Sequence, residues 1–349
     1  MKKLVLTDFG KVEIQEAPIP VPGPEEAVVQ IQYAGICGSD LHVFSGLHPS
    51  ARLPLIMGHE ACGRLYAIRS RRPDLRIGDK VCFHTVKPCG SCENCCRGRE
   101  NLCDRVKIMG TNLDGVFTQY MLVDANRLIR FREDVDMRVA ALVEPLTVGV
   151  HDVRRAGLRA GADVLIAGAG PIGLILAITA RFAGAAHVLL SEPNPVRIRL
   201  ARELGFLAAD PGRPDFQEAC AAATGGAGFD AAFEVTSLQA GFETCLSRLK
   251  KGGVMVQVGM PPKGTRFSID IDKIIYGETE LRGVRHHTMS SMQAAAKLIN
   301  SGVLNAQLEK LVSAVYPLED SMSAFLRARD DKTALRVLID FSESASSAS

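Results

Sequence analysis

The sequence predicts an α/β protein in which a doubly wound parallel sheet is joined to a β-barrel-type domain, and three observations support this fold class. From about Ala140 onward, apolar runs of strand length alternate with helical runs, which is typical of a parallel sheet covered by helices. A glycine-rich turn directly follows the first of these apolar runs. The preceding third of the chain instead holds short β-type runs, such as Val28–Tyr33, separated by turn residues.

The predicted elements follow one another in a regular order. Strands are expected at 163–167, 187–190, 230–235, 254–258 and 280–283, and helices at 174–183, 197–204 and 242–249. Beyond Val284 the pattern predicts one further helix, at 291–299, among mixed segments. The strand–helix alternation therefore covers the middle of the chain, and the residues on either side of it do not show this alternation.

The composition is that of a soluble globular protein with one large or two medium domains. The 349 residues are 47% hydrophobic and 23% charged, and the formal net charge is +2. Acidic and basic residues are interspersed, so we expect no nucleic-acid partner. No apolar stretch is long enough to cross a membrane or to act as a signal peptide, so we expect no membrane association. Ser342–Ser349 is expected to be a frayed tail.

The glycine-rich turn fits the G-x-G-x-x-G pattern of dinucleotide sites through Gly168, Gly170 and Gly173. It follows an apolar strand and opens a helix, where a pyrophosphate can approach the backbone at the positive helix N-terminus. Glu192 ends the next predicted strand, where an acid binds the adenosine ribose and repels a 2′-phosphate, which favours NAD over NADP. Arg197 could instead receive a phosphate. The alternative is a structural glycine turn with a solvated Glu192.

Cysteines are concentrated in one segment, residues 89–103. Cys89, Cys92, Cys95 and Cys103 offer four thiolates, which form a closed tetrahedral shell around a structural zinc ion and leave no position open for catalysis. Cys96 is expected to point away. An iron–sulfur cluster is the alternative metal group. Close cysteine spacing without a secretion signal also favours a reducing compartment, and we expect the cytoplasm.

A different donor set is spread over three other segments. Cys37 lies in the first, His59 and Glu60 form the second, and Glu144 lies in the third, before Pro145. Thiolate, imidazole and carboxylate together suit a zinc ion that keeps an open coordination position. Each residue alone has an ordinary structural role, and Glu144 in particular could be a helix-start acid that favours the local dipole.

An open zinc ion and a dinucleotide site together predict alcohol oxidation. Zinc binds the hydroxyl oxygen and lowers its pKa, so that an alkoxide forms and expels a hydride to the nicotinamide. The proton must still leave the site. Ser39 can take it through its hydroxyl, and His42 can pass it to solvent.

On these residues the sequence resembles the zinc-containing medium-chain dehydrogenase/reductase family over nearly its whole length. The motifs that carry the resemblance are Cys37–His42, Gly58–Glu60 and the four-cysteine segment. The resemblance implies a split GroES-like catalytic domain, residues 1–145 plus 285–349 with a structural zinc lobe at 89–103. Its insert, residues 146–284, is a Rossmann NAD-binding domain. It also implies Cys37 and His59 as catalytic zinc ligands, and Glu60 as a ligand or close partner.

Glu144-Pro145 is similar to the sorbitol (polyol) and threonine dehydrogenase branch, in which this glutamate lies on or beside the zinc, often through the bound water. The resemblance also implies a homodimer or homotetramer. It adds further cofactor contacts at Ile172, Arg197, Val258, Gly259, Met260, Val284, Arg285 and His286.

The sequence departs from sorbitol dehydrogenases at two substrate-pocket positions. Val43 replaces a tyrosine, and His286-His287 replaces Arg-Tyr. Ser39 stands where threonine dehydrogenases usually carry threonine, and residues 45–54 are similar to a sugar-acid dehydrogenase subgroup. We therefore predict an enzyme that oxidises a secondary hydroxyl of a small polar polyol or sugar acid with zinc and NAD. The alternatives are a threonine 3-dehydrogenase and a catalytically silent NAD-binding protein.

Overall fold

The computed structural model describes residues 1–48 and 51–342. They form two compact units, a first unit of residues 1–147 with 287–349 and a second unit of residues 148–286. Helix α4 (Val143–Ala156) begins in the first unit and continues into the second, so the division falls inside this helix. The expected tail lies outside the described residues from 343 onward, as do residues 49–50 of the segment 45–54.

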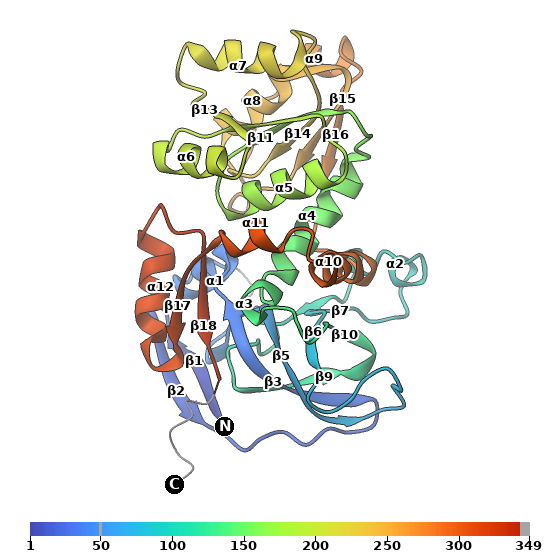
Figure 1. Ribbon diagram of the computed structural model, residues 1–349, viewed down its shortest axis with the longest axis vertical. Coiled ribbons are helices and arrows are strands. Elements are labelled where there is room, and N and C mark those ends of the chain that lie inside the picture. Colours follow the sequence, from blue (N-terminus) through green and yellow to red (C-terminus); the bar gives the residue numbers. More distant parts are fainter. Residues whose placement is uncertain (49–50, 343–349) are drawn as a thin grey trace. The chain divides into compact units, whose positions relative to one another are not determined.

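The second unit is built on a six-stranded parallel sheet with the order β13-β12-β11-β14-β15-β16. In chain order this is 3-2-1-4-5-6, the arrangement of dinucleotide-binding sheets, so the predicted doubly wound fold is confirmed. Helices cover both faces (Figure 1). The strands are β11 (Asp163–Ala167), β12 (His187–Ser191), β13 (Leu207–Ala209), β14 (Phe229–Glu234), β15 (Leu249–Gln257) and β16 (Glu280–Gly283). The helices are α5 (Pro171–Phe182), α6 (Pro195–Glu203), α7 (Asp215–Thr224), α8 (Gln239–Arg248) and α9 (Ile271–Ile275).

Several elements of this unit, among them β13, α7 and α9, have no counterpart in the sequence prediction. Strand β13 is a three-residue edge strand with the sequence Leu-Ala-Ala, which has little intrinsic β preference. Helix α7 follows it and packs on β12 and β13. Helix α5 also starts earlier than expected, because Pro171 is well suited to the first helical position.

The first unit holds a seven-stranded sheet with the order β10-β6-β5-β3-β18-β17, and β9 pairs with β3 beside it. Strands β17 and β18 come from the C-terminal segment, and Ile339 of β18 pairs with Ala34 of β3. The residues after 287 thus complete the sheet begun by the first third of the chain. The strands are β3 (Glu26–Gly35), β5 (Glu60–Arg69), β6 (Lys80–Phe83), β9 (Tyr120–Asp124), β10 (Leu128–Arg130), β17 (Val312–Pro317) and β18 (Arg336–Asp340).

Smaller elements surround this sheet. A three-stranded sheet has the order β2-β1-β4, and β7 pairs with β8. These strands are β1 (Lys2–Asp8), β2 (Lys11–Glu16), β4 (Leu55–Ile56), β7 (Val86–Lys87) and β8 (Lys107–Ile108). The helices are α1 (Gly38–Phe44), α2 (Glu93–Cys96), α3 (Met137–Ala140), α10 (Met289–Ser301), α11 (Asn305–Glu309) and α12 (Ser321–Asp330).

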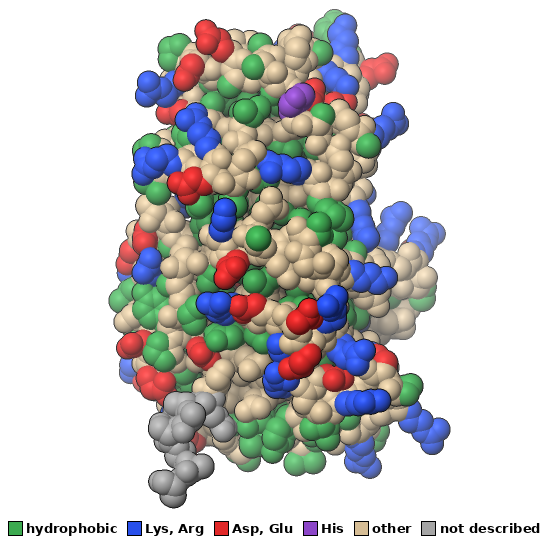
Figure 2. All heavy atoms as spheres, in the orientation of Figure 1, with side chains coloured by type: hydrophobic (Ala, Val, Ile, Leu, Met, Phe, Trp, Pro, Cys, Tyr) green, Lys and Arg blue, Asp and Glu red, His purple; other side chains and the backbone are tan. Residues whose placement is uncertain are grey.

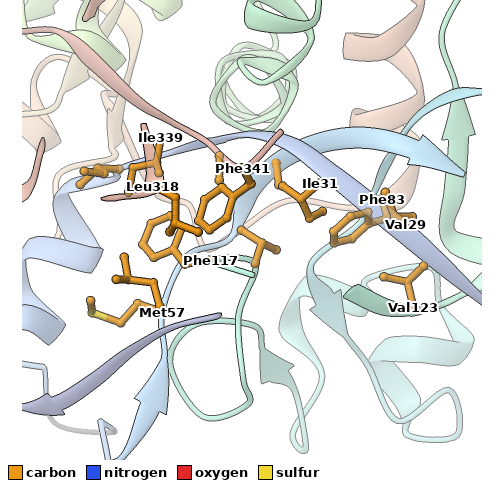
Figure 3. Packing of buried hydrophobic residues seen from close by; sticks show 14 of the residues in the cluster. Val29, Ile31, Met57, Phe83, Phe117, Val123, Leu318, Ile339 and Phe341 are labelled. Atoms are coloured by element: carbon orange, nitrogen blue, oxygen red, sulfur yellow. The ribbon is translucent and has the colours of Figure 1, made fainter. Parts of the chain in front are cut away.

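Phenylalanine side chains pack among aliphatic ones in the core of the first unit (Figure 3). Phe117 stacks on Phe341 with ring centroids 6.3 Å apart, and Phe44 stacks on Phe325 at 5.0 Å. Phe341 follows the last strand, so burying it ties the C-terminal segment to the N-terminal sheet. Val43, expected beside a substrate pocket, is fully buried in this cluster.

On the face shown in Figure 2, acidic and basic side chains are intermixed over each unit. Among the described residues, no helix is both long and apolar enough to span a bilayer.

Candidate active site and metal centres

Three of the expected zinc donors converge in the first unit. Donor atoms of Cys37, His59 and Glu60 all lie within 4.8 Å of one another. Cys37 is the N-cap of α1, and His59 and Glu60 stand at the start of β5. A helix start and a strand start therefore bring together residues that are separated in sequence. The donor set of thiolate, imidazole and carboxylate fits a zinc ion.

Asp40 orients two of these donors, and the sequence reading did not assign it a role. Its carboxylate is fully buried and accepts hydrogen bonds from the backbone N–H groups of Cys37 (2.9 Å) and Gly58 (3.2 Å). One oxygen lies 3.4 Å from Nδ1 of His59, which leaves Nε2 for a metal ion. Burial lowers the pKa of His59, but the charges of Asp40 and Cys37 outweigh it and raise that pKa well above its usual value. A pocket that favours positive charge to this extent suits a cation.

Glu60 is paired with a second residue missed from sequence, Arg336. One guanidinium nitrogen of Arg336 donates to both carboxylate oxygens of Glu60, at 2.8 and 3.0 Å. Burial raises the pKa of Glu60, and Arg336 only partly opposes this. An arginine inside the apolar run Ala334–Ile339 was the available signal for a buried charge partner.

Glu144 lies outside the three-donor group, although its charge is close enough to raise the pKa of Glu60. Its Oε1 accepts a hydrogen bond of 2.8 Å from Nε2 of His287. Burial alone would raise the pKa of Glu144, but the hydrogen bond from His287 opposes burial and the pKa is lowered to about 2. Glu144 is therefore a buried carboxylate beside the candidate metal centre, a position from which it could act through a bound water.

The two expected relay residues lie on helix α1. The hydroxyl oxygen of Ser39 is 3.4 Å from Nε2 of His59, so it lies beside the donor group. His42 is exposed to solvent. A proton released at the metal centre would thus have a hydroxyl beside it and an imidazole in contact with water on the same helix.

The four expected cysteines of the lobe also converge, with sulfur atoms within 4.8 Å of one another. The sulfur of Cys95 lies 3.4 Å from that of Cys92 and 3.9 Å from that of Cys89. A tetrahedral zinc ion with Zn–S bonds of about 2.3 Å places its sulfurs roughly 3.8 Å apart, so the spacing fits. Backbone hydrogen bonds lower the pKa of Cys89 to about 5, which favours the thiolate that binds metal. Cys96 is exposed and lies outside this group, as expected.

In the second unit, the glycine turn has the backbone that a pyrophosphate site needs. Gly168 has φ +106°, a region unfavourable for other residues. A Cβ on Gly173 would lie 2.0 Å from the carbonyl oxygen of Gly168, so α5 can approach the strand only with glycine there. Gly170 is the N-cap of α5. The turn therefore presents a helix N-terminus to a ligand.

Glu192 lies beside this turn and is buried. Its two oxygens accept backbone hydrogen bonds from Ala169 (2.8 Å) and Asn194 (2.9 Å), which tie the strand end to the turn. Arg197 reaches to 3.8 Å from the carboxylate of Glu192. The acid and the cation expected at the adenosine end of the cofactor are thus neighbours.

Two family models of zinc-binding dehydrogenases match the chain, in agreement with the metal donors and the dinucleotide turn described above. The description "Alcohol dehydrogenase GroES-like domain" matches residues 23–133, and "Zinc-binding dehydrogenase" matches residues 171–301. The chain belongs to the zinc-binding alcohol dehydrogenase family. The expected family resemblance and GroES-like and Rossmann domains are thereby confirmed, and the dehydrogenase acts with zinc and a nicotinamide cofactor.

Several relatives match the dehydrogenase over nearly its full length. It is 33% identical to 2-dehydro-3-deoxy-L-galactonate 5-dehydrogenase of Pseudoalteromonas atlantica, covering 91% of this chain and 92% of the relative. It is 32% identical to L-threonine 3-dehydrogenase of Saccharopolyspora erythraea, and the match covers 98% of this chain and 99% of that relative. A zinc-binding dehydrogenase from Sinorhizobium meliloti 1021, solved bound to NADP, has a TM-score of 0.89 at 29% identity and covers 97% and 98%.

The remaining expected cofactor residues follow the ends of strands in the second unit of the dehydrogenase. After β15, the backbone N–H groups of Val258 and Gly259 donate to the carbonyl oxygen of Glu234, and Met260 is exposed. After β16, Val284 is partly buried and Arg285 is exposed, and His286 has a positive φ of 49°. Ile172 is the second residue of α5 and is partly buried. All of them lie at the C-terminal edge of the sheet, where such folds bind nucleotides.

Two buried histidines of the dehydrogenase lie beside the metal donors: His84 was not assigned a role from the sequence, and His287 was expected only to line the substrate pocket. His287 contacts Glu144, and His84 contacts His287. His84 is a single histidine in an unremarkable segment, and its contact with His287 appears only after folding. The doubled histidine His286-His287 at a position expected to line the substrate pocket was the one available signal.

Proposed function

We propose that the dehydrogenase oxidises a secondary hydroxyl of a small polar substrate, a sugar acid or polyol, with NAD as hydride acceptor. The observation that carries the proposal is the convergence of Cys37, His59 and Glu60 with Glu144 beside them, in a chain that also carries the dinucleotide turn. Zinc, when bound, supplies a Lewis acid for the substrate hydroxyl.

The chain's own residues supply proton handling and orientation. Ser39 can accept the hydroxyl proton because its oxygen lies beside the donor group, and the solvent-exposed His42 can release it. Asp40 keeps His59 in one orientation through its contacts with the backbone of Gly58 and with Nδ1. The ionised Glu144 adds negative charge, which favours a cation beside it.

A sugar acid is the preferred substrate class. A relative at 33% identity is named for action on 2-dehydro-3-deoxy-L-galactonate, a sugar-acid derivative. L-Threonine is the second candidate, since a relative at 32% identity is named for it. Ser39 in place of the threonine usual at that position favours the first class.

The test is NAD reduction with a panel of sugar acids, polyols and L-threonine, by the zinc-loaded protein and by Cys37→Ala. We expect turnover with a sugar acid or polyol that Cys37→Ala lacks, while NAD still binds to both proteins. Turnover of L-threonine alone would select the second candidate. Cofactor binding with no turnover of any secondary alcohol would identify a nucleotide-binding protein that has lost catalysis.

NAD is proposed as the preferred cofactor because Glu192 places a carboxylate at the strand end that meets the adenosine ribose. The test is to compare activity with NAD and with NADP. NADP is the informative alternative because a similar structure was solved bound to NADP and because Arg197 lies close to Glu192.

The proposed partner is a second copy of the chain. Strand β16 is the last strand of the six-stranded sheet, and its Leu281 is exposed. Ile271, Ile275 and Tyr276, in and just after α9, are also exposed, and such edges commonly pair with another chain. Light scattering tests this. We expect at least a dimer that Leu281→Lys weakens, and no effect of Leu207→Lys on β13 at the opposite edge. A monomeric wild type would contradict the proposal.

We also propose that the enzyme works in the cytoplasm. All ten cysteines are free, and the lobe needs its thiolates reduced to hold metal. Cell fractionation with an antibody to the chain tests the compartment.

A further inference from the structure

Glu144 is the end of a buried series of hydrogen bonds that begins at Arg127, and we name Arg127, His84, His287 and Glu144 the histidine chain. Arg127 contacts Nδ1 of His84, and Nε2 of His84 lies 2.9 Å from Nδ1 of His287. Nε2 of His287 lies 2.8 Å from Oε1 of Glu144. Both histidines are 2% exposed and Glu144 is 8% exposed, so water does not compete for these contacts.

The direction of every hydrogen bond in the histidine chain follows from its two ends. Arginine is always protonated and can only donate, so Nδ1 of His84 must be the acceptor. A neutral imidazole that accepts at one nitrogen carries its proton on the other, so His84 donates from Nε2 to His287. His287 then accepts at Nδ1 and donates from Nε2 to the carboxylate oxygen Oε1 of Glu144, which accepts.

We propose that Arg127 and His84 fix the tautomer of His287, and that His287 is thereby a positioning residue that always donates to Glu144 beside the catalytic metal centre. The donated hydrogen bond occupies Oε1 and sets the orientation of the carboxylate, which leaves Oε2 for the metal centre. Without a donor at its Nδ1, His287 could adopt the other tautomer and present a lone pair to Glu144. Outer partners of this kind normally alter metal affinity or activity about 10- to 100-fold.

The four-cysteine lobe anchors the start of the histidine chain. Glu100, which lies within the lobe, accepts a hydrogen bond of 3.1 Å from Arg127. Its other oxygen accepts from the backbone N–H of Met289, two residues after His287. One lobe residue therefore holds both the cation that orients His84 and the segment that carries His287, which gives the structural lobe a route to the catalytic site.

The role of His287 in turnover rests on the proposed function, whereas the assignment of its tautomer does not. The direct test is long-range ¹⁵N–¹H NMR of the full-length, zinc-loaded protein labelled with ¹⁵N-histidine, recorded without substrate or cofactor. We expect His84 and His287 each to show the neutral pattern with the proton on Nε2. A proton on Nδ1 of either ring, or on both nitrogens of either ring, would overturn the proposal.

Variants of His84 separate hydrogen bonding from ring volume. His84→Phe keeps a ring but offers His287 no donor, so we expect His287 to lose its single tautomer and kcat to fall about 10- to 100-fold with the KM for cofactor unchanged. In His84→Gln the glutamine can accept a hydrogen bond from Arg127 and donate one to His287. This variant should therefore keep the single tautomer of His287 and a kcat near that of the wild type. The same two substitutions at His187, an exposed residue paired with Asp163 in the second unit, are the matched controls.

The outcomes distinguish the two proposals. An unchanged His287 tautomer in His84→Phe, with wild-type kcat, would reject the positioning role. The expected tautomers without turnover of any secondary alcohol would reject the proposed function alone. If His84→Phe fails to fold, the wild-type protein and His84→Gln still test the proposal. A proton on Nδ1 of His287 in the spectrum of either protein would contradict it.

Discussion

One guanidinium nitrogen of Arg336 lies 2.8 and 3.0 Å from the two carboxylate oxygens of Glu60, and both side chains are almost fully buried. Strands β5 and β18, which start at these residues, lie on either side of β3 in the same sheet. A residue from near the C-terminus thus neutralises an acid of the candidate metal centre. Such a pair contributes little net stability when intact, but breaking it leaves a buried charge without a partner.

We therefore predict that Arg336→Gln lowers the free energy of unfolding of the first unit by about 3–5 kcal/mol. Denaturant unfolding of the zinc-loaded protein measures the change. Arg327→Gln is the control, because Arg327 forms a partly exposed pair with Asp331 and should cost little. An Arg336→Gln protein as stable as Arg327→Gln would show that Glu60 does not need its partner.

Glu144→Gln should keep the fold and reduce turnover. Glutamine retains an oxygen that can accept from His287, but it removes the negative charge beside the metal centre. We expect kcat to fall about 10- to 100-fold and the pH at which activity rises to change. The exposed Glu309→Gln is the control. If Glu144 only favours the helix dipole, its loss would cost about 0.3–1 kcal/mol of stability and leave the pH–rate profile unchanged.

The two metal sites should separate functionally. Cys37→Ala removes a donor of the open site and should abolish turnover while the melting temperature changes little. Cys92→Ala should lower the melting temperature, because its lobe has a short helix with no buried residue and depends on metal for order. Zinc content and thermal unfolding of both variants test this. Full activity of Cys37→Ala would contradict the mechanism.

The parts of the site that could be predicted from sequence are those whose residues are close in sequence or fall in fixed motifs. Cys89 to Cys103 and the glycine turn are local patterns, and the strand–helix alternation predicts the sheet around the turn. The pairs Arg336–Glu60 and His84–His287 are separated by 276 and 203 residues, respectively. No local pattern encodes such contacts, because they arise only when the C-terminal segment joins the N-terminal sheet.

The cofactor preference depends on the neighbours Glu192 and Arg197. We predict a higher kcat/KM with NAD than with NADP, and a still larger ratio in Arg197→Ala, because that variant lacks the cation able to meet a 2′-phosphate. Arg199→Ala, an exposed residue of the same helix α6, is the control. A wild-type preference for NADP would mean that Arg197 outweighs Glu192.

Asp152 on α4 should destabilise the fold at neutral pH. Its side chain is fully buried, both of its oxygens lack hydrogen-bond partners among the described residues, and burial raises its pKa well above the usual value. Because the folded pKa exceeds the unfolded pKa, the unfolded chain releases the proton first as pH rises. Stability is therefore lost between the unfolded pKa, about 3.8, and the folded pKa, at about 1.4 kcal/mol for each unit between them.

Asp152→Asn removes this ionisation with little change in volume, so it should melt higher than wild type, by more at pH 8 than at pH 5. Thermal unfolding at both pH values measures the difference. Asp215→Asn, an exposed change on α7, should leave the melting temperature almost unchanged at either pH. A difference between Asp152→Asn and wild type that does not vary with pH would mean that the folded protein accommodates the charged carboxylate. The buried site would then carry a partner for Asp152 when the protein is in solution.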